Sequence, residues 1–124
     1  MSSSTKSKVK PLPTEAIQQH YSQCQGELQA LAQKIGELES EADEYGLVLV
    51  TLEESLAKEP ERKCFRLIGS VLVERTVKDV VPALQTTREG IHGTISTLAE
   101  QYKTKEQEFE TFKRDYNIRP VPAS

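Results

Sequence analysis

The chain lacks most of the residues that build a large globular core. Its 124 residues include no tryptophan and one methionine, and aromatic residues make up only 6%. Hydrophobic residues reach 36% while charged residues reach 28%, a balance that is thin for a globular domain and common in coiled coils and assembly subunits. The length leaves room for a single domain. These numbers favour a helical coiled coil or an assembly subunit.

Long hydrophobic runs and a charge excess of one sign are also missing. No stretch approaches the roughly 18 consecutive apolar residues of a membrane-spanning helix. The formal net charge is −3 with acidic and basic residues interleaved, so no basic stripe points to nucleic acid. We therefore expect neither a membrane nor a nucleic acid as partner. Residues 1–13 carry lysines without an apolar run behind them, unlike a signal peptide, and we expect a disordered tail there in a soluble cytoplasmic protein.

Cysteine, histidine and glycine are too scattered for a recognisable catalytic or metal-binding motif. Cys24 and Cys64 stand far apart without a CxxC pair, which favours reduced, buried thiols and leaves a disulfide as the less favoured alternative. His20 is isolated and is expected to be a solvated helix residue. The acidic residues between 37 and 44 lack the turn and spacing of a calcium loop, and Gly69 lacks a phosphate-loop pattern. We predict no catalytic residue, no metal and no cofactor, hence no enzyme.

An apolar repeat with alternating steps of four and three residues fills the first half of the chain. Its positions are Ile17, Tyr21, Cys24, Leu28, Leu31, Ile35, Leu38, Ala42, Tyr45, Leu49, Leu52 and Leu56. A repeat of 3.5 residues keeps one seam of a helix facing a partner helix, which is typical of a coiled coil. Pro60 ends the run because proline cannot continue a helix. The pattern predicts a helix over 14–59.

The second half of the chain repeats the pattern. Its positions are Val77, Val81, Leu84, Arg88, Ile91, Ile95, Leu98, Tyr102, Lys105, Phe109, Phe112 and Tyr116. Only Arg88 and Lys105 are polar, and polar residues on such a seam fix the register or extend their charged ends to water. The pattern predicts a helix over 76–117 and a short tail over 120–124. Since the segment between the two helices turns back on itself, the helices should lie antiparallel.

A β-hairpin is predicted over 62–75, between the helices. Gly69 and Ser70 separate two apolar runs and suit a two-residue type II′ turn, which pairs Ile68 with Val71. Both faces of the hairpin are then apolar, through Phe65, Leu67, Ile68, Val71, Leu72 and Val73. An isolated hairpin is marginally stable in water, and its open edges are a liability unless another chain covers them. We therefore interpret the hairpin as an assembly element that pairs with other subunits.

The hairpin sequence also resembles a known family. Residues 63–82, "KCFRLIGSVLVERTVKDVVP", are similar to β-class subunits of the eukaryotic prefoldin co-chaperone, as is the late Asn117-Ile118-Arg119. The helix–hairpin–helix plan matches over 14–119. The resemblance implies a mostly α fold, a long antiparallel two-helix coiled coil with one β-hairpin between the helices.

The same resemblance implies a function and partners. Prefoldin is a heterohexamer of two α-class and four β-class subunits whose hairpins join into a β-barrel platform. Its coiled-coil tips hold unfolded clients, chiefly actin and tubulin, and pass them to the cytosolic group II chaperonin without ATP. The alternative left by the residues alone is a coiled-coil scaffold or tether without chaperone activity, although a simple tether needs only a loop between its helices.

The far end of the coil is the predicted client-binding tip. Counting outward from the turn predicts Leu56 near Leu84 and Leu38 near Tyr102. The same count gathers Ile17, Tyr21 and Cys24 with Phe109, Phe112, Tyr116 and Ile118 at the tip. Helix ends fray, and little of the seam is left to cover the residues beyond Phe112, so these side chains are expected to bind exposed apolar segments of clients. For Phe109 the alternative, that it closes the end of the coil, stays open.

Overall fold

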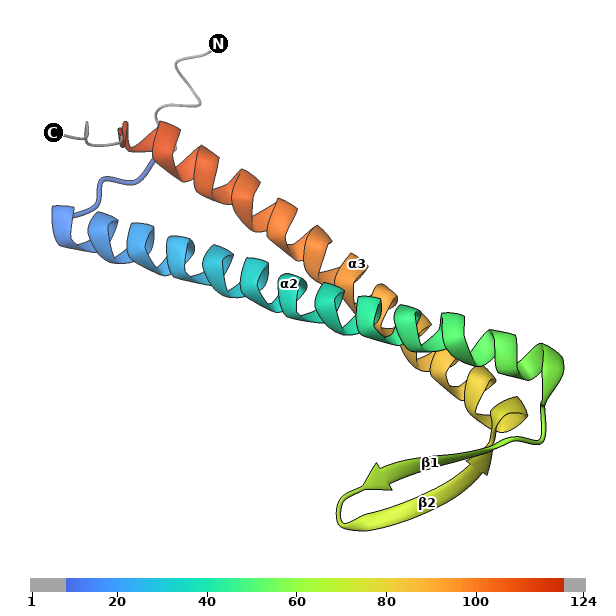
Figure 1. Cartoon of the computed structure of the whole chain (residues 1–124). Coiled ribbons are helices and arrows are strands. Elements are labelled where there is room, and N and C mark those ends of the chain that lie inside the picture. Colours follow the sequence, from blue (N-terminus) through green and yellow to red (C-terminus); the bar gives the residue numbers. More distant parts are fainter. Residues whose placement is uncertain (1–8, 120–124) are drawn as a thin grey trace, which may run out of the picture. The chain divides into compact units, whose positions relative to one another are not determined.

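The computed structural model describes residues 9–119 (Figure 1). In chain order it contains the helix α2 (Thr14–Lys58), the strands β1 (Lys63–Ile68) and β2 (Val71–Thr76), and the helix α3 (Val77–Asp115). The two strands form one antiparallel sheet. Two long helices with a β-hairpin between them are the predicted fold class, which is confirmed. The predicted tails fall in large part on residues 1–8 and 120–124, which lie outside the described residues.

The chain divides into two compact units. The hairpin unit contains residues 35–97, and the tip unit contains the described parts of 1–34 and 98–124. Each unit holds a segment of α2 and a segment of α3.

The apolar seam predicted from the sequence is the buried face of both helices. Every predicted seam position on α2 and α3 is at least partly shielded from solvent, and most other helix positions are exposed. The most deeply buried residues are Ala42, Leu49, Val77, Val81, Phe109 and Phe112. Helix formation and burial thus follow the same 3.5-residue repeat, as in a coiled coil.

The core of the hairpin unit lies where the hairpin joins the helices. Leu49 of α2 packs with Val77 and Val81 of α3, the latter two 0% and 2% exposed. Leu52, Leu56, Cys64 and Leu84 pack around this cluster. Leu56 and Leu84 therefore both border this cluster, although they do not lie level with each other as predicted, because the register of the coil differs.

Backbone hydrogen bonds fix the start of α3 against the loop after α2. The amide of Val77 donates to the carbonyl of Arg62 at 2.9 Å, and the amide of Lys78 donates to the carbonyl of Pro60 at 3.1 Å. The first amides of a helix have no partner within the helix, so these two bonds satisfy groups that would otherwise depend on water. The base of the hairpin is thereby held at the end of the helix pair.

The hairpin has the predicted register and turn. Ile68 pairs with Val71, Leu67 with Leu72 and Arg66 with Val73. Gly69 has a φ of 62°, whereas Ser70 is not among the described residues with positive φ. A type II′ turn needs positive φ only at its first central residue, and a type I′ turn needs it at both. The backbone signs therefore match type II′.

Both polar residues on the seam reach across to α2. Arg88 donates from Nε to the carbonyl of Ala42 at 3.0 Å, and Lys105 forms an ion pair with Glu27. Arg88 also explains one helix glycine, because a Cβ added to Gly46 would lie 2.9 Å from its Nη2. Glycine at position 46 leaves room for the guanidinium beside the helix backbone. These two contacts fit the predicted role of the polar residues in fixing the register.

The coil register counted from the turn is wrong by about two helical turns. The count places Glu27 level with Lys113, but its ion pair is with Lys105, eight residues or about 12 Å nearer the hairpin at 1.5 Å per residue. Similarly, Ala42 accepts from Arg88 rather than lying level with Leu98. An asymmetric connection accounts for about half of this shift. Four residues, Glu59 to Arg62, separate α2 from β1, whereas β2 runs directly into α3.

Candidate assembly and client-binding surfaces

The hairpin exposes the apolar residues that the sequence assigns to assembly. Five of them, Phe65, Leu67, Ile68, Val71 and Leu72, are between 54% and 68% exposed, and Val73 is half-buried. Contiguous apolar surface of this kind marks an interaction site in a soluble protein. Both outer edges of the two-stranded sheet also lack a neighbouring strand within the described chain. The hairpin therefore offers side chains and backbone groups to another chain.

The two faces of the hairpin differ in their surroundings. Alternation along the strands puts Phe65, Leu67 and Leu72 on an outer face, where an ion pair of 3.2 Å joins Lys63 to Glu74. The inner face carries Cys64, Arg66, Ile68, Val71, Val73 and Arg75. The inner face is turned toward the helices, across a groove.

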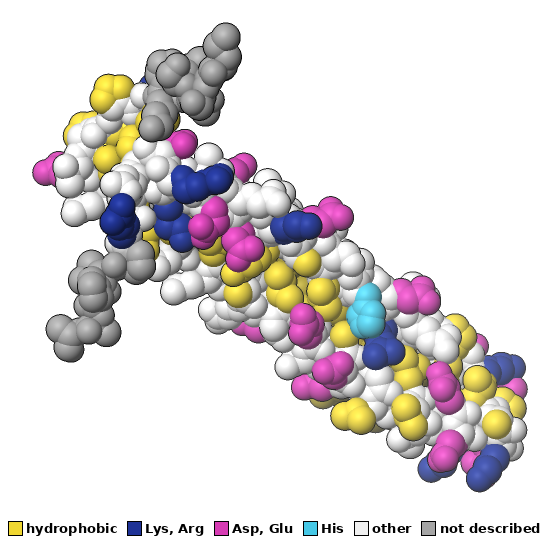
Figure 2. Space-filling view, turned by 90° about the horizontal axis from the view of Figure 1, so that it is seen from above, with side chains coloured by type: hydrophobic (Ala, Val, Ile, Leu, Met, Phe, Trp, Pro, Cys, Tyr) yellow, Lys and Arg dark blue, Asp and Glu magenta, His cyan; other side chains and the backbone are white. Residues whose placement is uncertain are grey.

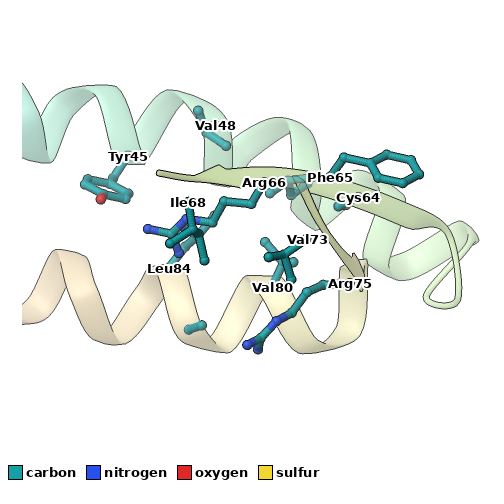
Figure 3. A pocket seen from close by; sticks show the side chains of 12 residues that line it. Tyr45, Val48, Cys64, Phe65, Arg66, Ile68, Val73, Arg75, Val80 and Leu84 are labelled. Atoms are coloured by element: carbon teal, nitrogen blue, oxygen red, sulfur yellow. The ribbon is translucent and has the colours of Figure 1, made fainter. Parts of the chain in front are cut away.

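This groove is lined by both helices and the hairpin (Figure 3). It has a volume of about 540 Å³, and its helix walls are Tyr45, Val48 and Leu52 of α2 with Val80, Ala83 and Leu84 of α3. Arg66 and Arg75 are the charged residues of its lining, and neither forms an ion pair with another described residue. The groove can accommodate apolar side chains and place a carboxylate near an arginine.

The aromatic residues of the tip unit form a packed cluster. Tyr21 lies against Phe109 with ring centroids 5.0 Å apart, and Phe112 lies 5.1 Å from Tyr116. Phe109 and Phe112 are only 7% and 9% exposed. Lys113 lies over the Phe109 ring at 4.7 Å, a cation–π contact. In this structure both phenylalanines close the end of the coil.

His20 belongs to this cluster, which the sequence analysis missed. Its ring meets Phe112 edge-on, with centroids 4.4 Å apart, although the residue as a whole is exposed. His20 lies one turn from Ile17 and Cys24 on α2, so its position flanking the seam was the available signal. His20 is exposed, as expected, and in addition contacts the Phe112 ring.

Cys24 is positioned as a structural thiol. It is half-buried, and its Sγ lies 3.5 Å from Nε2 of His20. Burial and then the Glu27 carboxylate raise the pKa of Cys24, while Lys105 partly offsets this effect. A raised pKa leaves less of the reactive thiolate at neutral pH. Cys24 and Cys64 are both free.

The Asn117-Ile118-Arg119 motif begins with a helix stop. The amide of Ile118 donates to the carbonyl of Lys113 at 2.8 Å, and the amide of Asn117 donates to that of Arg114 at 3.2 Å. Asn117 has a φ of 54°, a left-handed conformation that asparagine tolerates. This bond pattern is a Schellman motif. It holds Ile118, half-buried, beside the last turn of α3.

A segment before α2 covers part of the tip. Residues Val9–Pro13, here called the strap, run from beside the end of α3 to the start of α2 (Figure 1). The Tyr116 hydroxyl donates to the carbonyl of Lys10 at 2.6 Å. The strap therefore contacts the seam beyond Phe112 at Tyr116, where the sequence predicted little cover.

Two further kinds of feature, a membrane-spanning helix and a metal site, were considered among residues 9–119. Within residues 9–119 no helix is long and apolar enough to cross a membrane. Over the same range no group of three or more histidine, cysteine or acidic side chains is placed to hold a metal ion. On the face that Figure 2 shows, acidic and basic side chains are interspersed.

A helix–hairpin–helix chain whose hairpin is apolar and uncovered belongs to the class of assembly subunits. The family model described as "Prefoldin subunit" matches residues 15–120. The chain belongs to the prefoldin subunit family, and so to a co-chaperone whose subunits assemble with one another. The resemblance seen in the hairpin sequence is thereby confirmed.

Individual relatives agree with this membership. The chain is 45% identical over 111 residues to the probable prefoldin subunit 2 of Schizosaccharomyces pombe, covering 90% of this chain and 95% of that protein. It is 46% identical over 93 residues to human prefoldin subunit 2, covering 75% of this chain and 58% of the human protein. The prefoldin β subunit of Thermococcus strain KS-1 has the same fold, with a TM-score of 0.71 at 20% identity, covering 90% of this chain and 98% of that one.

Proposed function

We propose that this chain is a β-class subunit of a cytoplasmic heterohexamer with two α-class and four β-class members. In this assembly the hairpins join into a platform, and the coiled-coil tips capture unfolded proteins of the actin and tubulin type. The complex delivers them to the group II chaperonin without using ATP. The subunit performs no covalent chemistry in this function.

The observation that carries the proposal is the uncovered hairpin. Five large apolar side chains on a segment of only two strands are more than half exposed, and neither strand edge has a neighbouring strand among residues 9–119. A coiled-coil tether has no use for such a surface, whereas a hexamer platform covers it on both faces. The inner-face groove, with Arg66 and Arg75 in its lining, suits an apolar segment of a neighbouring subunit that also carries an acidic residue.

The tip supplies the second part of the proposal. Its aromatic cluster is packed in the free subunit, so client capture requires the end of the coil to loosen. Helix ends open at a lower free energy than the rest of a structure. Several such tips on one hexamer hold a client by multivalency while each contact stays weak enough to release.

The test is reconstitution with candidate partner subunits. The chain alone should self-associate or aggregate through its hairpin, and co-expression with α-class and β-class prefoldin subunits should yield a hexamer in native mass spectrometry. The purified hexamer should suppress the aggregation of denatured actin on dilution. A stable, monodisperse monomer that enters no hexamer would favour the tether instead.

A further inference from the structure

The strap lies on the tip as a bound peptide would. Its contact with α3 is made by a backbone group, the carbonyl of Lys10, which accepts from the Tyr116 hydroxyl at 2.6 Å. Val9 is half-buried, and Leu12 is 41% exposed. The strap belongs to no helix or strand. The tip unit therefore already contains one example of an extended segment docked against α3.

The strap has the conformational character of an unfolded chain. Lys10 and Leu12 each precede a proline, and residues before proline are restricted to extended conformations. Pro11 and Pro13 have fixed φ and no amide hydrogen to donate. Extended polyproline-like backbone is a major conformer of unfolded proteins. A carbonyl beside apolar side chains is common to every such chain, so recognition through it is tolerant of sequence.

We propose that the strap occupies the client-binding tip of α2 and α3 in cis, and that the extended apolar segment of a client displaces it. Tyr116 recognises the peptide backbone in both states, and the side chains around it take apolar groups. This inference rests on the proposed function and adds a built-in competitor for the client.

The strap is held weakly enough to be displaced. A single neutral hydrogen bond shifts an equilibrium by roughly twofold to tenfold, and the partial exposure of Leu12 adds little burial. No client binds while the strap occupies the site. The apparent affinity for a client is therefore the intrinsic affinity multiplied by the fraction of time that the site is free. Removal of the strap should therefore raise client affinity by a similar factor.

The test compares two truncations in the assembled hexamer. Deletion of residues 1–12 removes the strap but keeps Pro13, whose carbonyl accepts the amide of Ile17 at 3.1 Å. Deletion of residues 1–8 keeps the strap and is the matched control. The probe is fluorescently labelled, reduced and carboxymethylated α-lactalbumin, a permanently unfolded protein. We expect the deletion of 1–12 to tighten binding roughly twofold to tenfold, and the deletion of 1–8 to leave it unchanged.

A photocrosslink tests the displacement directly. A photoreactive phenylalanine analogue at position 12 should crosslink to the last turns of α3 in the free hexamer and lose this crosslink when the probe is in excess. Unchanged or weakened binding after deletion of 1–12, or a crosslink insensitive to the probe, overturns the inference and leaves the proposed function intact. Failure of every hexamer, the full-length one included, to bind the probe overturns capture at the tip itself.

Discussion

Single residues determine how the two helices meet, and Arg88 shows the mechanism most clearly. It occupies a seam position where an apolar residue is usual, and it places Nε 3.0 Å from the carbonyl of Ala42. A polar seam residue that finds a partner at only one register disfavours the others. Gly46 contributes to this contact because a side chain at position 46 would occupy space that the Arg88 guanidinium now fills.

The first prediction concerns Gly46. Replacing an exposed helix glycine with alanine should stabilise a protein by about 1 kcal/mol, and Gly36→Ala, which meets no atom within 4 Å, should give that gain. Gly46→Ala should give none or a loss, since its Cβ would lie 2.9 Å from Nη2 of Arg88. Chemical denaturation followed by circular dichroism measures both. In an Arg88→Ala background, Gly46→Ala should stabilise the protein about as much as Gly36→Ala does, because the guanidinium is absent. Equal stabilisation by both glycine substitutions in the wild type would contradict the packing of Arg88 against Gly46.

The second prediction concerns the ion pair of Glu27 and Lys105. The hydrogen bond with Lys105 lowers the pKa of Glu27, and the same bond raises the pKa of Lys105 above 10.5. A carboxyl with a lowered folded-state pKa stabilises above its unfolded pKa, and this contribution is lost as pH falls through the folded pKa. The lysine contribution is lost as pH rises through its raised pKa. The pair should therefore contribute between about pH 5 and pH 10.

A pH series of denaturation midpoints for wild type and Glu27→Gln measures this contribution. Their difference should be small, since exposed pairs contribute little, and it should shrink below pH 4. Exposed Glu39→Gln is the control, and a difference that stays constant from pH 7 to pH 3 would contradict the assignment.

At the scale of elements, changes on the outer face of the hairpin should affect assembly much more than they affect folding of the isolated chain. Its outer face carries exposed Phe65, Leu67 and Leu72, so changes there cost the isolated chain little. In an assembled platform the same positions would be buried, and an unpaired buried charge costs several kcal/mol. The effect of a substitution on assembly can therefore be measured separately from its effect on the fold of the isolated chain.

The third prediction follows from this separation. Leu67→Asp or Leu72→Asp should lower hexamer yield at least about tenfold, which needs only about 1.4 kcal/mol per assembly contact, and should leave helix content unchanged. Co-purification with partner subunits and far-ultraviolet circular dichroism give the two readouts. Ala57→Asp, on an exposed position of α2 in the same unit, should assemble normally. A wild-type hexamer yield from both leucine variants would show that the hairpin does not form the platform.

Local sequence signals predicted the elements, and non-local contacts account for what they missed. The 3.5-residue repeat identified every seam position, and the turn at Gly69 set the hairpin register, because both depend on neighbouring residues. The coil register failed because it depends on the unequal connections at the two ends of the hairpin. His20 and the strap were missed because their contacts join residues about 90 or more positions apart, His20 to Phe112 and Lys10 to Tyr116. No local pattern encodes such a pairing.

At the scale of the whole molecule, the proposed function gives the two units separable tasks. Under it the exposed hairpin serves assembly, and the packed aromatic cluster of the tip unit, with the strap beside it, serves client capture. If clients bind at the tip, changes there should alter capture without altering assembly. The sign of the change in capture should also depend on which part is removed, because in the proposed scheme the strap competes with clients and the aromatic residues bind them.

The last prediction is loss of capture when the tip is dismantled. Phe112→Ser with Tyr116→Ser, or truncation after Lys113, removes apolar surface worth roughly 25 cal/mol per Å² to a bound segment. Hexamers should still form, because the hairpin is unchanged, but should suppress aggregation of denatured actin several-fold less well. This loss of capture is opposite in sign to the expected effect of strap removal.

Because Phe112 is only 9% exposed, its loss also destabilises the coil by a few kcal/mol. Ile95→Ser, a seam change in the hairpin unit, controls for loosening alone. Equal loss of capture in both variants would trace the effect to destabilisation of the whole coil, beyond the opening of its end. Undiminished capture by assembled Phe112 and Tyr116 variants would place client binding elsewhere.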